Sequence, residues 1–124
     1  MKIKQLSVFV ENKTGRINEV TQILGSNGVN MTAFSLADSG EFGILRMIVS
    51  DVGRAVSALK EARFGISVTE VVCFCCPNEP GALSIVLDCL ARENVFIEYM
   101  YAFSDGDTAR VCLLYTSDAA DDLT

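Results

Sequence analysis

The spacing of apolar residues changes from a strand period to a helix period within the first quarter of the chain. From Gln5 to Val10 every second side chain is aliphatic, which is typical of a strand with one buried face. Beyond Gly15, apolar residues recur at positions 17, 20 and 24 along one helix face, and the run Gly-Ser-Asn-Gly at 25–28 supplies a stop. The sequence therefore predicts a strand followed by a helix.

Two more strands and a second helix complete a first unit. Residues 31–37 and 42–49 predict strands joined by a turn-rich link that suits a hairpin. Apolar residues at 52, 55, 56 and 59 predict a helix, which Ser50 or Asp51 can cap at its start and a left-handed Gly65 at its end. A short strand at 66–69 closes the order βαββαβ. That order is the ferredoxin-like plan, an antiparallel sheet with helices on one face.

The pattern then starts again. Val8–Ile17 is echoed by Phe74–Leu83, and the glycines of the two segments, Gly15 and Gly81, are 66 residues apart. In the copy we expect a helix over 83–90 with Pro80 near its start, a strand over 96–103 and a further strand that begins at 108–111. The fold class is α+β, with a first repeat at 1–69 and a second, truncated repeat at 70–111.

From Cys112 onward the chain resembles a translated sequencing adapter of the tagmentation type. The DNA TGT-CTC-TTA-TAC-ACA-TCT-GAC-GCT-GCC-GAC encodes the residues from Cys112 to Asp121. Because the match runs over consecutive codons, we interpret 112–124 as read-through and expect a longer native protein. The alternative is a native acidic tail.

Composition narrows the class of protein. The chain has 124 residues, 50% of them hydrophobic, and a net charge of -6. It has no apolar run that suits a membrane span, and its basic residues do not cluster as nucleic-acid binding requires. It has no histidine, which is the commonest general base and metal ligand. We expect a cytoplasmic, non-catalytic protein with no cofactor, no metal and neither nucleic acid nor membrane as a partner.

Three of the five cysteines lie within residues 73–76. Cys73 and Cys76 form a C-x-x-C, which in an intracellular protein can indicate metal or redox chemistry. No second pair follows, and alternation along a strand sends these two side chains to opposite faces. We favour reduced thiols that fill a buried strand.

Both repeats place Asn-x-x-Gly between the first strand and the first helix, at 12–15 and at 78–81. Free N–H groups and the positive end of the helix dipole favour a carboxylate at such a junction, and glycine permits close approach. An asparagine oxygen can accept from an ammonium group. The loop therefore suits a zwitterion such as a free amino acid. A turn that only caps the helix is the alternative.

These loops, the apolar residue two positions after each glycine and the run Gly-Val-Asn-Met at 28–31 resemble the ACT domain. The likeness spans residues 1–111 and implies a tandem ACT regulator, whose effector amino acid lies at an interface between paired domains. It implies ligand-binding roles for residues of both repeats: Asn12, Gly15, Arg16, Ile17, Asn30, Asn78, Gly81, Ala82 and Leu83. Phe96 replaces the equivalent of Asn30, so we expect the better site in the first repeat.

Two classes of function follow. The first is an amino-acid-binding regulatory or sensor protein that forms a homo-oligomer through sheet or ACT–ACT pairing, with a metabolic enzyme as a further partner. The second is a ligand-independent assembly module or regulatory subunit. An enzyme would need a thiolate such as Cys75 or Cys89 activated without histidine, which nothing else in the sequence supports.

Overall fold

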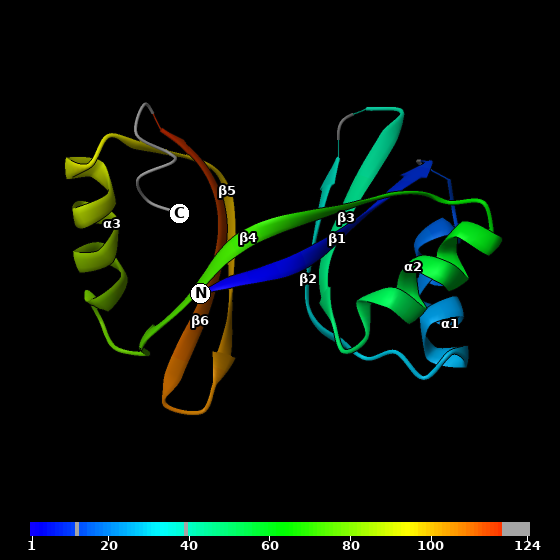
Figure 1. The fold of residues 1–124 in the computed structure, drawn as a ribbon, viewed down its shortest axis with the longest axis horizontal. Coiled ribbons are helices and arrows are strands. Elements are labelled where there is room, and N and C mark those ends of the chain that lie inside the picture. Colours follow the sequence, from blue (N-terminus) through cyan, green and yellow to red (C-terminus); the bar gives the residue numbers. More distant parts are fainter. Residues whose placement is uncertain (12, 39, 118–124) are drawn as a thin grey trace. The chain divides into compact units, whose positions relative to one another are not determined.

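The computed structural model describes residues 1–11, 13–38 and 40–117, which fold into two compact units (Figure 1). The first unit is Lys4–Glu70, and the second combines Met1–Ile3 with the chain from Val71 onward. Within the second unit the Cys73 N–H donates to the Met1 carbonyl over 2.7 Å. No helix in the described ranges has the length and apolar character needed to cross a membrane.

The first unit is one sheet with two helices. Its elements in chain order are β1 (Lys2–Glu11), α1 (Arg16–Ser26), β2 (Met31–Asp38), β3 (Phe42–Val49), α2 (Val52–Glu61) and the start of β4 (Gly65–Pro77). The sheet order is β2-β3-β1-β4, and β3 pairs antiparallel with both β1 and β2. This is the βαββαβ order predicted from the sequence, and it confirms the ferredoxin-like fold.

Both helices of the first unit cover the same face of its sheet (Figure 1). Alternate aliphatic residues of β1 and β3 are buried there with Val20 and Leu24 of α1 and Ala55 and Leu59 of α2. Burial of apolar surface is the main stabilising term of such a core. The core fixes the end of β1 and the start of α1, and thus the ends of the loop that joins them.

The caps of α2 differ in part from expectation. The Asp51 side chain accepts from the Arg54 N–H over 3.0 Å, so Asp51 is the N-cap. The predicted left-handed cap at Gly65 is wrong, because Gly65 does not have a positive φ and opens β4 instead. Arg63 takes the left-handed conformation, with φ 68°. Gly65 lies beside the Phe9 ring, where a Cβ would meet the ring at 3.7 Å.

β4 also differs from the prediction of two separate strands. It is a single strand of 13 residues, and only its first part, Gly65–Glu70, belongs to the first unit. The segment from Val68 to Cys76 is rich in β-branched and apolar residues and contains neither Gly nor Pro. Nothing in it interrupts an extended backbone, so the end of the first repeat runs directly into the second.

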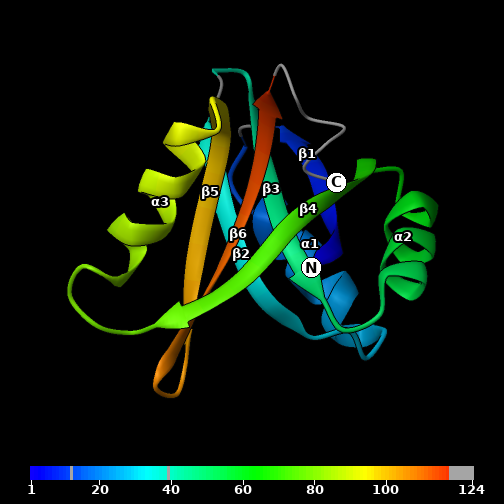
Figure 2. The same cartoon turned by 60° about the vertical axis from the view of Figure 1, so that its left-hand side comes forward.

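The second unit has the order β4-α3-β5-β6 over the described residues, with α3 (Ala82–Arg92), β5 (Val95–Asp105) and β6 (Thr108–Ser117). Its sheet order is β4-β6-β5, and β6 pairs antiparallel with both neighbours. Figure 2 shows α3 beside β5. β6 continues past Val111 to Ser117. The interpretation of 112–124 as read-through concerns the source DNA and stays a prediction.

The two units share a strand register at the predicted offset of 66 residues. Val10 pairs with Gly43 in the first unit, and Cys76 pairs with Ala109 in the second. The irregularity between Met31 and Ala33 in β2 recurs between residues 97 and 99 in β5. A repeated bulge is a backbone feature rather than a chance match of side chains. The two repeats therefore share the same backbone conformation and strand register.

Candidate functional site

The loop between β1 and α1 ends on a glycine whose backbone conformation favours glycine. Gly15 is the N-cap of α1 with φ 86°, and Gly81 is the N-cap of α3 with φ 84°. No heavy atom lies within 4 Å of a Cβ built at either position. The left-handed backbone disfavours other residues, and the open space lets a ligand approach the main chain. A glycine cap also offers no side-chain acceptor to the N–H groups of the first helical turn. Asn12 lies outside the described residues.

A cavity of about 240 Å³ opens beside this loop, entirely within the first unit. It lies where the end of β1, the start of α1 and the β2–β3 hairpin meet. It is lined by apolar and charged residues: Val10, Glu11, Lys13, Ile17, Leu36, Asp38 and Gly43. Of the predicted binding residues that the structure describes, Ile17 is the one that lines it.

Three charged residues of both signs, Glu11, Lys13 and Asp38, line this cavity, and the part that they line is called its mouth below. The Lys13 ammonium pairs with the Glu11 carboxylate over 3.0 Å, and this hydrogen bond and the Lys13 charge lower the pKa of Glu11. Asp38 accepts from the Gly40 N–H over 3.0 Å. A wider hollow of about 410 Å³ at the same end adds Glu41. The mouth can thus meet an ammonium group with carboxylates and a carboxylate with Lys13.

Arg16 is directed into the fold. Its guanidinium lies 4.4 Å from the centre of the Phe64 ring and pairs with Glu19 one turn along α1. Its Nε is buried and has no hydrogen-bond partner among the described residues. A stacked guanidinium of this kind stabilises packing through a cation–π contact. The geometry therefore ties Arg16 to the helix start, and a ligand role for it stays a prediction.

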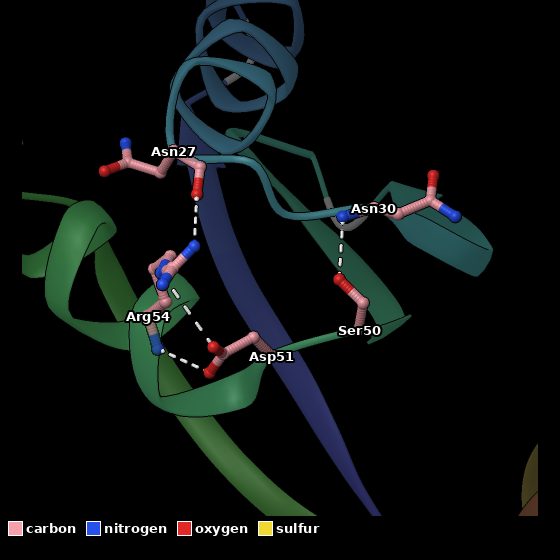
Figure 3. Close-up of polar contacts among 5 residues, drawn as sticks. All are labelled: Asn27, Asn30, Ser50, Asp51 and Arg54. Carbon is pink, nitrogen blue, oxygen red and sulfur yellow. Dashed lines mark hydrogen bonds and ion pairs between the residues drawn. The ribbon is translucent and has the colours of Figure 1, made fainter.

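Asn30 lies at the other end of the first unit from Gly15. Its N–H donates to Ser50 Oγ and its carbonyl accepts from the Ser50 N–H, both over 2.9 Å. Figure 3 shows its side-chain amide pointing away from Ser50 and Arg54. β3 separates the two ends, and its 8 residues span about 23 Å at about 3.3 Å per residue. One ligand cannot touch Asn30 and the Gly15 loop of the same unit.

The second unit keeps the loop backbone but changes its side chains. The Asn78 N–H donates to the Asp107 carbonyl over 3.0 Å, which ties the loop to the β5–β6 turn. Ala82 and Leu83, the first residues of α3, are half-buried. Phe96, at the position equivalent to Asn30, is 69% exposed. Their ligand-binding roles stay predictions.

The C-x-x-C motif has the predicted strand geometry. Val72 and Phe74 of β4 line a cavity with Val86 and Leu90 of α3, so the even-numbered positions of β4, Cys76 included, face the helix. Cys73 lies on the opposite face and pairs in register with Cys112 of β6. Cys73, Cys76 and Cys112 are buried. No cluster of potential metal ligands occurs in the described ranges.

Sequence reasoning missed most of the cavity. Glu11, Lys13, Leu36, Asp38 and Gly43 line it but were not predicted as site residues. A signal for the first two was present, since opposite charges flank the Asn-x-x-Gly loop. The others lie on the β2–β3 hairpin and reach the loop through strand register, because Asp38 pairs with Gly43 and Gly43 with Val10.

Comparisons with known proteins agree with this fold. The family described as the ACT domain pair matches residues 1–123. Protein BT0572 from Bacteroides thetaiotaomicron is 47% identical, with a TM-score of 0.90 over 98% of this chain and 83% of that one.

Two more distant structures share the fold. The regulatory subunits of aspartate kinase from Thermus thermophilus and Thermus flavus are 14% and 12% identical, with TM-scores of 0.66 and 0.64. The first match covers 96% of this chain and 86% of that one, and the second covers 91% and 85%. None of the curated proteins compared with the chain matches it. Family match, strand order and repeated register agree: the chain belongs to the family of ACT domain pairs.

Proposed function

We propose that this ACT domain pair is a regulatory protein whose first unit binds a free amino acid beside the β1–α1 loop. The observation that carries the proposal is the cavity with apolar walls and charges of both signs at its mouth. A zwitterion with a side chain needs these features together. Gly15 supports it by leaving the main chain open to close approach.

The regulatory role is part of the same proposal. The structures from Thermus are regulatory subunits of an enzyme, and they share the fold of this chain. No nucleophile paired with a base occurs among the described residues of the predicted site, and the chain has no histidine. We therefore propose a cytoplasmic protein that transmits the level of an amino acid to a metabolic enzyme.

We further propose that two copies complete the site. Asn30 lies about 23 Å from the loop end of its own unit, since about 3.3 Å separates successive residues of a strand. A second copy can bring its own Asn30 amide to that loop. β2 supports pairing of copies, because it is an edge strand on which Phe34 is 64% and Leu36 is 53% exposed.

A thermal-shift panel of the free amino acids on the full chain tests binding. A ligand at 100 times its dissociation constant adds about 2.7 kcal/mol to stability, so one member should raise the Tm by several degrees. No shift with any member would contradict the proposal. Asn30→Ala should weaken binding, whereas Asn27→Ala is the matched control, because the Asn27 side chain already donates to the Ile23 carbonyl.

The exposed edge also favours a second candidate, a ligand-independent assembly module. Light scattering with and without the amino acids separates the two functions. Association that responds to an amino acid supports the sensor. Association that never responds, with no thermal shift, supports the assembly module.

A further inference from the structure

We infer that the cavity beside the β1–α1 loop selects neutral amino acids with bulky apolar side chains. This inference rests on the proposed function and deepens it, since it names the class of effector. It places the effector side chain in the cavity and the effector ammonium and carboxylate groups at its mouth.

The cavity wall determines which side chain fits. Val10, Ile17 and Leu36 contribute only aliphatic groups to it. A charged side chain placed against them would lose hydration, and the charged residues of the cavity, Glu11, Lys13 and Asp38, are already engaged by the effector ammonium and carboxylate groups. An apolar side chain gains free energy on leaving water. Aspartate, glutamate, lysine and arginine should therefore bind more weakly than apolar amino acids of similar size.

The volume of the cavity favours large side chains over small ones. An enclosed apolar cavity of about 150 Å³ holds a benzene molecule, whereas this cavity, which is open to solvent on one side, measures about 240 Å³. Leucine, methionine and phenylalanine side chains fill such a space better than the methyl group of alanine. Each further methylene in a fitting pocket strengthens binding by about tenfold or more.

Gly43 controls how much of that volume is free. It lies in β3 at the cavity, where it pairs with Val10 of β1 and with Asp38 of β2. A Cβ at this position would meet Leu36 Cδ1 at 3.3 Å and Val10 Cγ2 at 3.4 Å. Its φ is not positive, so alanine is compatible with the backbone. The added methyl group would displace the flexible end of Leu36 and narrow the cavity.

The mouth determines how the zwitterion lies. Glu11, Asp38 and the neighbouring Glu41 are carboxylates, and Lys13 is the cation beside them. The negative excess holds the effector ammonium, and Lys13 with the first turn of α1 holds the effector carboxylate. An acidic effector would place a second carboxylate against this excess, which is a further reason for its weaker binding.

Calorimetric titration of the full chain with leucine, phenylalanine, alanine, aspartate and lysine tests the inference. We expect leucine or phenylalanine to bind at least about tenfold tighter than alanine, aspartate or lysine. Tighter binding of aspartate or lysine would overturn the selectivity while the proposed function stands. No binding by any amino acid would overturn both.

Gly43→Ala tests the cavity itself, with Gly25→Ala as the matched control. Gly25 lies in α1, and no heavy atom lies within 4 Å of a Cβ there. Gly43→Ala should weaken leucine or phenylalanine binding about tenfold, the effect of about one methylene, and leave alanine binding unchanged. Gly25→Ala should change neither. Unchanged leucine and phenylalanine binding in Gly43→Ala, with an unchanged Tm, would overturn the placement of the side chain.

The Asp38→Asn variant tests the charged mouth of the cavity separately from its apolar wall. Asparagine keeps an oxygen that can accept from the Gly40 N–H but loses the charge. Asp38→Asn should weaken the binding of leucine and the binding of phenylalanine by the same factor, because both amino acids present the same ammonium group. A loss confined to one of them would overturn the assignment of Asp38 to the ammonium.

Discussion

The two units have the same backbone and different side chains at the loop. Both place a left-handed glycine before the first helix and a bulge at the same point of the next strand. At the offset of 66 residues, however, Lys13 becomes Glu79 and Gly43 becomes Ala109. Both units have the loop backbone. Over the described residues, only the first unit has the Lys13–Glu11 ion pair and a glycine at the cavity. The two units thus share a backbone but not the side chains beside the loop.

The helices of the two units also differ in burial. α1 buries Val20 and Leu24, whereas none of the residues of α3 is buried. Leu90, the equivalent of Leu24, is half-buried and lines a cavity of about 160 Å³. The first unit is therefore the better packed of the two over the described residues, which suits it to hold a site rigidly.

The largest expected effect comes from truncating this matched pair of leucines. Leu24→Ala should lower the free energy of unfolding by about 3 kcal/mol, since it leaves a cavity in a packed core. Leu90→Ala should lower the free energy of unfolding by about 1 kcal/mol, because the half-buried Leu90 side chain removes less apolar surface from water on folding. Urea denaturation of both variants measures the two values. Equal losses would contradict the difference in packing.

The second expected effect is a loss of stability at alkaline pH, caused by a cysteine of the second unit. Burial and the neighbouring Cys73 raise the pKa of the Cys112 thiol from 9.0 to about 12. Between these values the unfolded chain releases a proton that the folded chain keeps, so the free energy of unfolding should fall as pH rises from 9. Denaturation at a series of pH values measures the slope, and Cys112→Ala should reduce it. An unchanged slope in that variant would refute the assignment.

The smallest expected effect should be equal in the two units. Gly15→Ala and Gly81→Ala each force a Cβ into a left-handed conformation, with no contact to relieve or worsen it. Each should cost about 1–2 kcal/mol. Thermal denaturation of the two variants, with Gly25→Ala as control, checks this. A difference well above 1 kcal/mol between them would mean that the two loops are not equivalent.

Periodicity predicted the elements well because the first unit buries one face of most of them. The strand at Phe42–Val49 and the helices at Arg16–Ser26 and Val52–Glu61 lie where the spacing places them. The pattern failed at two polar positions of β1. Gln5 and Ser7 are buried although the alternation marks them as the exposed face of β1.

The candidate site was harder to predict than the fold. Local sequence marks the loop, since Gly15 and its neighbours are contiguous. The cavity wall on β2 and β3 depends on strand pairing, which brings Leu36 and Gly43 to Val10 from distant positions. Asn30 was placed with the loop by resemblance, and the fold puts it at the other end of β3. A resemblance names residues without saying which copy they come from.

The most direct test of the account is the stoichiometry of amino-acid binding in matched charge variants. Titration calorimetry of the full chain should give one site per chain. Lys13→Glu, which gives the first unit the residue of the second, should weaken binding about tenfold or more, whereas Glu79→Lys should leave it unchanged. Two sites per chain, or a loss of binding in Glu79→Lys rather than in Lys13→Glu, would contradict the assignment of the site to the first unit.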